Sequence, residues 1–241
     1  MNYAVIFAGG VGKRMNTKDR PKQFLEVNGK PILVHTVEHF ERHPEIDGIC
    51  VVCLEEWIDY CKALFCRFNI KKVRWIVSGG ETAIKSQYNG LRAICSSIDV
   101  TADDIVLIHD GVRPLINFDV ISNCINGVRE FGSAIVVAPA IETIAIENSE
   151  GYISRVIPRS DCVLARAPQC FYLENIWSAH VEARRNNDDS YIDSVSLMLA
   201  YGHRVHTVLG PMENIKVTTP SDYYICSGLL DAKKAEQKKE C

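Results

Sequence analysis

Short apolar runs alternate along the chain with stretches in which apolar residues recur every three or four positions. Such runs are typical of buried strands, and the periodic stretches are typical of amphipathic helices. The pattern predicts strands over residues 3–8, 48–54, 73–80, 104–111, 133–140 and 203–210. It predicts helices over residues 31–43, 55–68, 86–98, 118–132, 175–186 and 193–202. Residues 214–235 read as a short strand followed by a terminal helix, with Thr219 as N-cap and Pro220 at its first position.

The predicted strands are apolar throughout rather than at alternate positions. Strands of that kind are buried on both faces, as in parallel sheets covered by helices. We therefore predict one α/β domain over residues 1–241, with a Rossmann-like, mostly parallel twisted sheet and helices on both faces. Between about residues 139 and 160, two β-branched stretches flank the turn sequence NSEG. This segment predicts a β-hairpin arm that protrudes from the domain.

Charge and cysteine content narrow the class of protein. The formal net charge of −3 argues against nucleic acid or an anionic membrane as the main partner. The sequence has no apolar stretch long enough to span a bilayer, and the pattern of a secretion signal is missing from its N-terminus. The ten cysteines form no recognisable disulfide framework, and Cys50 and Cys53 would point to opposite faces of one strand. We expect reduced, structural thiols in a cytoplasmic protein.

A glycine-rich loop, AGGVGKRM at 8–15, follows the first predicted strand. It matches neither the G-x-x-x-x-G-K-[ST] phosphate loop nor the G-x-G-x-x-G dinucleotide fingerprint. Ligands bind at the carboxyl ends of strands in open α/β sheets, and glycines let backbone N–H groups approach phosphate oxygens. A tight turn with solvated basic residues is the alternative for this loop alone. The predicted phosphate-binding residues are Ala8, Gly9, Gly10, Gly12 and Lys13, with Arg14 and Lys22 adding positive charge.

Further segments follow in order along nearly the whole chain: PKQFL at 21–25, GKPIL at 29–33, GGE at 79–81, HDGVRP at 109–114, APQCF at 167–171 and NIKVTTPSD at 214–222. Together with the first loop they resemble the CTP-dependent polyol-phosphate cytidylyltransferases. That family includes the ribitol-5-phosphate and the methylerythritol-phosphate enzymes. The resemblance implies a nucleotidyltransferase fold and an enzyme that transfers CMP from CTP to a polyol phosphate and releases pyrophosphate.

Such a transfer depends on positioning and on charge stabilisation more than on a protein nucleophile. By resemblance, the catalytic residues are Arg14, Lys22 and Lys216. The family also implies Mg²⁺ or another divalent cation, held mainly by the CTP phosphates, with Asp110 as the candidate metal-side carboxylate. Ala83 stands where the family usually has an arginine, and Lys85 is the candidate to replace that charge. Further nucleotide contacts fall by resemblance on Gly79, Gly80, Glu81, Ser86, Asp110 and Gly111.

The acceptor side distinguishes the two branches of the family. The FAGG start, the longer segment between Arg14 and Lys22, and ETIA at 142–145 favour the ribitol branch. Ala167 departs from both branches, which usually have threonine there. We expect D-ribitol 5-phosphate as acceptor, giving CDP-ribitol for capsule or teichoic acid synthesis. The alternative acceptor is 2-C-methyl-D-erythritol 4-phosphate of isoprenoid biosynthesis, and another polyol or sugar phosphate remains open.

The arm is expected to join two copies of the chain. In the family it reaches across a homodimer, so that the neighbouring subunit completes the acceptor site. The sequence agrees, because the arm carries apolar residues that need a surface to cover them, namely Ile141, Ile144, Ile146, Ile153 and Val156. A hairpin packed on its own domain is the alternative. By resemblance, the acceptor-binding residues are Asp110, Arg113, Thr143, Arg159 and Lys216.

Other classes of protein remain as alternatives. A non-catalytic CTP-binding homologue fits the missing arginine at Ala83, but Arg14, Lys22 and Lys216 are all retained. A dinucleotide-dependent oxidoreductase would place an acidic residue near 30–35, where the chain reads KPILVH. A glycosyltransferase would usually show D-x-D after an internal strand, where this chain has HDGV.

Overall fold

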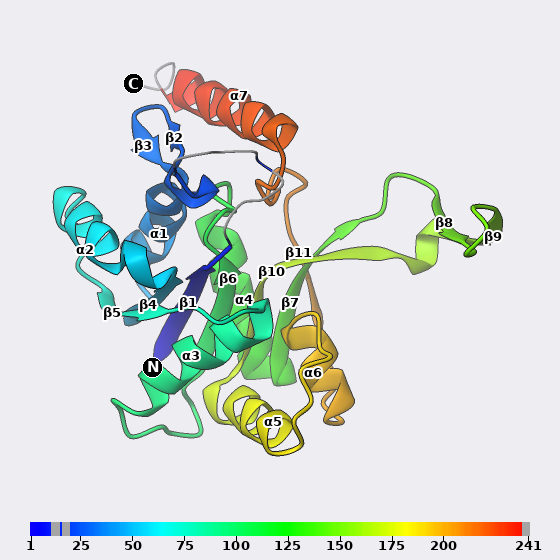
Figure 1. Cartoon of the computed structure of the whole chain (residues 1–241), viewed down its shortest axis with the longest axis horizontal. Helices are drawn as coiled ribbons and strands as arrows, with labels where there is room; N and C mark the ends of the chain where they lie inside the picture. The colour runs from blue at the N-terminus through cyan, green and yellow to red at the C-terminus, as the bar shows by residue number, and fades with distance from the viewer. Residues whose placement is uncertain (11–14, 16–19, 238–241) are drawn as a thin grey trace.

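The computed structural model describes residues 1–10, 15 and 20–237, and within them seven strands form one sheet (Figure 1). The strand order is β11-β7-β10-β6-β1-β4-β5, and within this sheet, as far as the chain is described, only β10 runs antiparallel to its neighbours. The predicted mostly parallel sheet is therefore confirmed. Its strands are β1 (Asn2–Ala8), β4 (Gly48–Cys53), β5 (Val73–Ser78), β6 (Ile105–Asp110), β7 (Ser133–Pro139), β10 (Val163–Tyr172) and β11 (Thr207–Leu209).

Helices cover both faces of the sheet, as the apolar strands predicted. One face packs against α1 (Ile32–Arg42), α2 (Ile58–Arg67) and α4 (Phe118–Phe131). The other packs against α3 (Ala83–Cys95), α5 (Leu173–Arg185) and α6 (Ser194–Ala200). Of the cysteine pair on β4, Cys53 belongs to the first core and Cys50 to the second, so the two thiols do point to opposite faces. None of the described helices is both long enough and apolar enough to cross a membrane.

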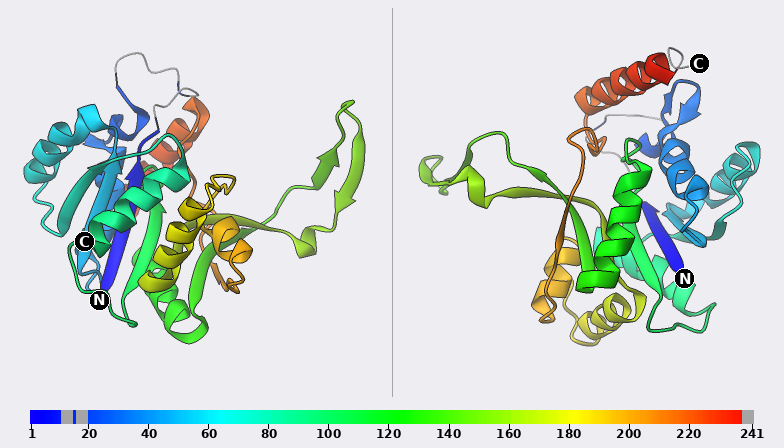
Figure 2. Two further views of the ribbon diagram at one scale, coloured as in Figure 1. Left: turned by 60° about the horizontal axis from the view of Figure 1, so that its bottom comes forward. Right: turned by 180° about the vertical axis from the view of Figure 1, so that it is seen from behind.

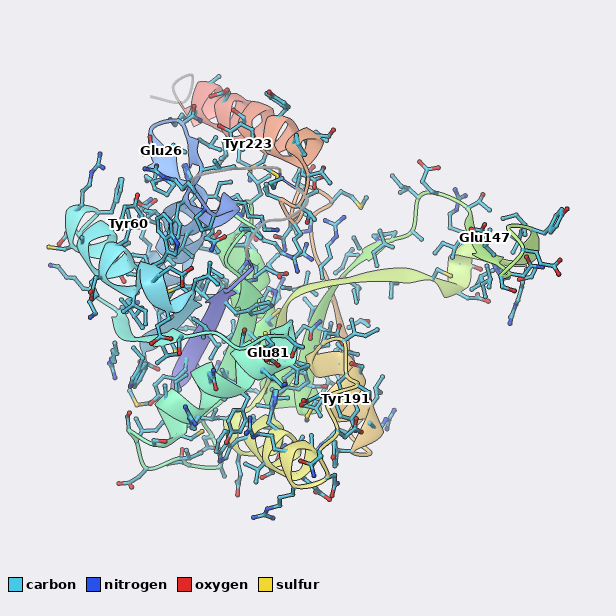
Figure 3. All side chains as sticks on the ribbon, in the orientation of Figure 1. Glu26, Tyr60, Glu81, Glu147, Tyr191 and Tyr223 are labelled. Atoms are coloured by element: carbon cyan, nitrogen blue, oxygen red, sulfur yellow. The ribbon has the colours of Figure 1, made fainter. Side chains whose placement is uncertain are left out.

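A smaller apolar cluster lies under the terminal helix α7 (Pro220–Gln237). Val27 and Ile32 meet Val112, Val217 and Cys226 there. A short hairpin of β2 (Glu26–Val27) and β3 (Lys30–Pro31) follows the 3-10 helix η2 (Lys22–Phe24). The Tyr223 hydroxyl of α7 donates a hydrogen bond of 2.6 Å to the carbonyl of Glu26 in this hairpin (Figure 3). A second 3-10 helix, η3 (Glu55–Trp57), precedes α2.

The predicted arm is present and projects away from the sheet (Figure 2). Its outer part is an antiparallel hairpin of β8 (Ile144–Glu147) and β9 (Ile153–Ile157), and the 3-10 helix η4 (Arg159–Asp161) leads back to β10. Several apolar side chains on it are largely exposed: Ile141 by 60%, Ile153 by 64% and Val156 by 57%. The hairpin is therefore not packed on its own domain, and this alternative is wrong.

Three sequence-based boundaries need correction. The strand predicted over residues 203–210 is shorter, since β11 covers only Thr207–Leu209. Residues 214–217 form no strand, because the segment crosses the end of β6 and makes a single backbone bond there, from the Val217 N–H to the Val112 carbonyl at 2.9 Å. Helix α3 begins at Ala83 rather than at residue 86, because the Thr82 hydroxyl accepts a hydrogen bond from the Lys85 N–H and caps it. The predicted start of the terminal helix at Pro220, after Thr219, is confirmed.

The strand order places a ligand crevice beside β1. The chain continues from β1 to β4 on one side, whereas β6 enters on the other side. Open α/β sheets bind ligands at such a switch point, outside the carboxyl ends of the strands. Here the carboxyl ends belong to Ala8 on β1 and Asp110 on β6.

Candidate active site

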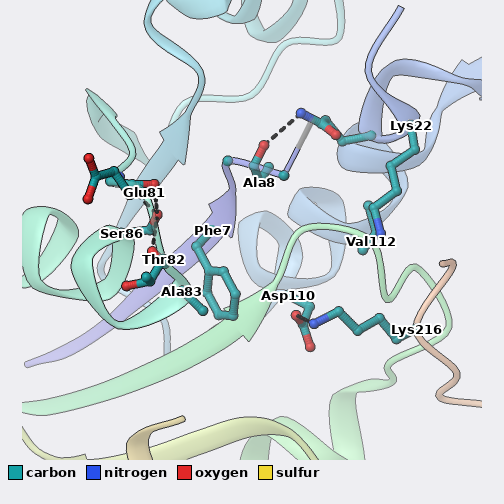
Figure 4. A pocket seen from close by; sticks show the side chains of 14 residues that line it. Phe7, Ala8, Lys22, Glu81, Thr82, Ala83, Ser86, Asp110, Val112 and Lys216 are labelled. Carbon is teal, nitrogen blue, oxygen red and sulfur yellow. Dashed lines mark hydrogen bonds and ion pairs between the residues drawn. The ribbon is translucent and has the colours of Figure 1, made fainter. Parts of the chain in front are cut away.

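Two adjoining cavities, each of about 220 Å³, open over these strand ends. The first lies between the glycine loop and the start of α3, and Figure 4 shows it from close by. The second lies between α3, β10 and the start of α6. Both cavities are lined by the same four residues at their junction, which are Phe7, Ala83, Asp110 and Lys216.

A buried side chain lies at the end of β1, where the glycine loop begins. Gln23 is 1% exposed, and its Nε2 donates a hydrogen bond of 2.6 Å to the carbonyl of Ala8. This bond fixes the end of β1, from which Gly9 and Gly10 continue along the cavity wall. Gln23 lies within the PKQFL motif, and its place in the site could not be predicted, because its burial beside Ala8 depends on the fold.

The second glycine loop is organised by Ser86. Its Oγ accepts a hydrogen bond from the Gly80 N–H at 3.0 Å and donates one to the Thr82 carbonyl at 3.0 Å. Gly79 allows this loop to lie against the first, since a Cβ there would be 3.1 Å from Ser86 Oγ and 3.6 Å from the Cα of Gly9. The two loops therefore form one backbone-lined wall.

An ion-paired cluster lies at the junction of the cavities. The Asp110 carboxylate receives Lys216 Nζ at 2.5 Å on Oδ1 and Arg113 Nε at 2.7 Å on Oδ2. Asp110 is 5% exposed. Burial alone would raise its pKa, but Arg113 and Lys216 outweigh burial and lower it, so the carboxylate stays ionised. In Figure 4, Lys216 and Asp110 point toward each other beside Phe7.

The segment that carries Lys216 is fastened on both sides. Lys22 Nζ donates a hydrogen bond of 2.9 Å to the Val217 carbonyl, and the Val217 N–H donates to the carbonyl of Val112, just after β6. At the start of α7, the Asp222 carboxylate accepts hydrogen bonds from the Thr218 and Thr219 N–H groups. Two lysines from the ends of the chain are thus brought to one cavity, where both line the wall.

Most described residues predicted to bind nucleotide do meet in the first cavity. Its lining includes Ala8, Gly9, Gly10, Lys22, Gly80, Glu81, Ser86, Asp110 and Lys216. Gly79 and Gly111 lie behind this wall, and Gly111 brings the strand ends together, since a Cβ on it would lie 2.9 Å from that of Ala8. Gly12, Lys13 and Arg14 lie outside the described residues.

The other predicted residues are placed differently. Arg113 lines the second cavity, and its guanidinium also donates to the Asn214 carbonyl at 2.9 Å. Thr143 and Arg159 lie on the arm and line neither cavity of this copy of the chain. Lys85 does not replace the missing arginine, because its Nζ pairs with Glu81 and Asp189 at 3.0 and 3.1 Å and lines neither cavity.

The described side chains do not form a metal cage. No cluster of three or more His, Cys, Asp or Glu residues is arranged for a metal ion in the described chain. Asp110 does not fit the role of metal ligand, because each of its carboxylate oxygens already faces a cation. A divalent ion at this site would have to take its ligands from a bound phosphate and from water.

This arrangement suits the joining of two phosphorylated molecules. The backbone wall and Lys22 can receive one phosphate chain in the first cavity, and Arg113 lies in the second. Lys216 borders both cavities, so that it can act on a group passed between them.

Comparison with known proteins agrees with this geometry. Residues 2–232 match the protein family described as 2-C-methyl-D-erythritol 4-phosphate cytidylyltransferase. The chain belongs to this cytidylyltransferase family. It is 49% identical over 237 residues to the ribitol-5-phosphate cytidylyltransferase of Streptococcus agalactiae serotype III (strain NEM316), covering 98% of each chain.

Relatives of lower sequence identity are named for methylerythritol phosphate rather than ribitol phosphate. The chain is 37% identical over 235 residues to the 2-C-methyl-D-erythritol 4-phosphate cytidylyltransferase of Clostridium acetobutylicum, covering 95% of this chain and 97% of that one. Its fold is similar to the crystal structure of 4-diphosphocytidyl-2C-methyl-D-erythritol synthase from Anaerococcus prevotii DSM 20548. The TM-score is 0.81 at 26% identity, over 95% of this chain and 96% of that one. The predicted family and nucleotidyltransferase fold are confirmed.

Proposed function

We propose that this chain transfers CMP from CTP to D-ribitol 5-phosphate, giving CDP-ribitol and pyrophosphate. The observation that carries the proposal is the junction of the two cavities at Lys216 and Asp110. CTP occupies the first cavity and the acceptor the second, so that the reacting phosphates meet beside Lys216. Membership of the cytidylyltransferase family supports CTP as the nucleotide.

In the reaction, an oxygen of the acceptor phosphate attacks the α-phosphorus of CTP. A new P–O bond forms there while the bond to the β-phosphate bridging oxygen breaks, and its electrons leave with pyrophosphate. Charge grows on the leaving group and on the oxygens around the α-phosphorus, where cations and N–H groups stabilise it. Lys22 and the backbone at Gly9 and Gly10 serve the triphosphate, together with Arg14 as the sequence predicts.

Lys216 changes partners during this cycle. In the absence of substrate its ammonium group faces the Asp110 carboxylate. An arriving phosphate offers a second anion at the junction, and Lys216 then lies between the two and helps to neutralise the transition state. Asp110 thereby holds Lys216 at the junction of the cavities. Lys22 and Lys216 act without a protein nucleophile.

The nucleotide base and ribose bind along the second glycine loop. The Gly80 and Ser86 contacts hold that loop in one conformation, so its backbone groups are fixed before the ligand arrives. A divalent cation such as Mg²⁺ would be held mainly by the CTP phosphates and would offset their charge.

The similarity to named relatives favours ribitol phosphate over methylerythritol phosphate. The relative at 49% identity is named for ribitol 5-phosphate, and the one at 37% for 2-C-methyl-D-erythritol 4-phosphate. The sequence features FAGG and ETIA agree with this order. The methylerythritol enzyme is therefore the second candidate.

We propose that two copies associate through the arm, and that Thr143 and Arg159 complete the acceptor site of the partner subunit. The exposed apolar residues of the arm and its projection from the sheet support this assembly.

We also propose a cytoplasmic location, which is supported by the free thiols of all cysteines in the described chain.

The proposal is tested by incubating the protein with CTP, Mg²⁺ and each of several polyol and sugar phosphates. Pyrophosphate release and a CDP-ribitol product with D-ribitol 5-phosphate are expected. Binding of CTP without pyrophosphate release from any acceptor would contradict the proposal and favour a non-catalytic homologue.

A further inference from the structure

Arg166 lies in the second cavity, and neither the sequence motifs nor the proposed reaction has assigned it a role. It belongs to β10, whose pairing with β7 shifts register between Ala165 and Gln169. Bulges of this kind redirect side chains and are frequent beside active sites. Here Ala165, Arg166 and Ala167 all line the cavity. Consecutive residues of a regular strand would point alternately to its two faces.

The backbone holds the Arg166 guanidinium in place. One terminal nitrogen, Nη1, donates to the carbonyls of Pro211 and Met212 at 3.2 and 2.7 Å. The buried Asn214 holds the bulge itself, donating from Nδ2 to the Ala167 carbonyl at 2.8 Å. Because a guanidinium has five N–H donors, these two bonds leave donors available toward the cavity.

The positive charge of Arg166 is only partly balanced, by the nearby Glu213. It forms no ion pair with any described Asp or Glu, whereas Arg113 and Lys216 share Asp110. The other carboxylate of the cavity, Asp193, accepts from the Ser196 N–H and from Gln169 Nε2. Burial and the nearby Arg113 both lower the pKa of Arg166, and Glu213 offsets only part of this. A bound anion would relieve the repulsion between the two guanidinium groups.

We propose that Arg166 binds the phosphate group of the acceptor, through an oxygen other than the one that attacks CTP. This inference rests on the proposed function, in which the acceptor phosphate lies in the second cavity near Lys216. Arg113 and Arg166 both line this cavity, so charged N–H donors are available there for the phosphate oxygens.

The variant Arg166→Gln tests this role, because glutamine keeps an N–H donor for the 211–212 carbonyls and removes the charge. The KM for the phosphorylated acceptor is expected to rise about tenfold to a hundredfold, the usual effect of losing a charge-assisted hydrogen bond. The KM for CTP should stay within about twofold. Arg129→Gln is the matched control, since Arg129 is an exposed arginine on α4 that lines neither cavity.

Inorganic phosphate distinguishes phosphate binding by Arg166 from two other roles, which are binding of the polyol hydroxyls and support of the Lys216 segment. With a non-hydrolysable CTP analogue in the first cavity, ³¹P NMR titration should show weaker phosphate binding to Arg166→Gln than to the wild type or Arg129→Gln. Unchanged phosphate affinity with a raised acceptor KM would place Arg166 on the polyol hydroxyls and overturn the proposal. Equal losses in CTP and acceptor kinetics would make it a support of the Lys216 segment, which also overturns it.

The titration needs no knowledge of the acceptor. If wild-type protein binds phosphate through Arg166 yet releases no pyrophosphate with D-ribitol 5-phosphate, the proposed acceptor fails while the inference stands. If the wild type turns over ribitol phosphate and Arg166→Gln does so with unchanged KM, the inference fails alone.

Discussion

The ammonium group of Lys216 lies 2.5 Å from Oδ1 of Asp110. The two residues come from the segment before α7 and from the end of β6, and they form the junction between the two cavities. Asp110 is almost fully buried, whereas the Lys216 side chain is 42% exposed. The carboxylate is thus the fixed member of the pair, and the ammonium group is the one that can turn to a substrate.

Asp110→Asn should damage both folding and catalysis. The amide would leave the Arg113 and Lys216 charges without their shared anion, and breaking a buried pair in this way costs about 3 kcal/mol of unfolding free energy. That figure is at the low end of the usual range because Lys216 is partly solvated. Urea denaturation measures the loss. A variant as stable as the wild type would show that the cluster is not an electrostatic unit.

Lys22→Ala should lose most turnover and keep the fold. Removing a cation directed at the developing phosphate charge typically lowers kcat about a hundredfold or more. Lys22 is only partly buried, so the melting temperature should change little. Lys62→Ala is the control, because Lys62 is exposed and pairs only locally with Asp59 on α2. A Lys22 variant with near-normal kcat would remove this residue from the mechanism.

The residues of this site could be predicted from the sequence, but the contacts between them could not. Asp110 and Lys216 each lie in a short motif, but their ion pair depends on the segment 214–217 crossing the end of β6. The same segment was predicted as a strand, since Ile215 and Val217 look like a β pattern. Val217 is instead buried under α7, away from any strand ladder. Local periodicity records that a residue is buried, but not which surface covers it.

Arg166 could not be found from its pattern. In a regular strand it would be one charged residue among apolar neighbours, and the bulge that directs it into the cavity depends on Asn214, which is 48 positions farther along the chain. The arm was predictable, by contrast, because its turn and its β-branched residues are contiguous. Lys85 shows that closeness in sequence can mislead. Its position next but one to Ala83 suggested that it replaces the family's arginine, whereas its ammonium group pairs with Asp189.

Mixed dimers test the shared acceptor site. Arg159→Ala and Lys216→Ala are each expected to be nearly inactive. In a mixed dimer, one site combines an intact Lys216 with the partner's intact Arg159. Random exchange of the two variants should therefore restore about a quarter of the wild-type activity. If the two variants exchange subunits and no activity returns, Arg159 does not act across the interface.

His180 should make folding sensitive to mild acid. Burial lowers its pKa from 6.5 to about 4, and its Nε2 has no hydrogen-bond partner within the described structure. Between these two values the unfolded chain binds a proton that the folded chain does not, so stability falls as pH falls below 6.5. One such group contributes about 1.4 kcal/mol per pH unit. His180→Phe should reduce the slope of unfolding free energy against pH, measured between about pH 6 and 5, by nearly that amount. An unchanged slope would show that His180 protonates readily in the folded protein.

The most direct test of the central claim is a competition in one reaction mixture. CTP, Mg²⁺ and equal concentrations of D-ribitol 5-phosphate and 2-C-methyl-D-erythritol 4-phosphate are incubated with the protein, and the two CDP-linked products are separated and quantified. The early product ratio equals the ratio of the two kcat/KM values. We expect CDP-ribitol to dominate, with pyrophosphate released in equal amount. A mixture dominated by the methylerythritol product, or one without either product, would contradict the account.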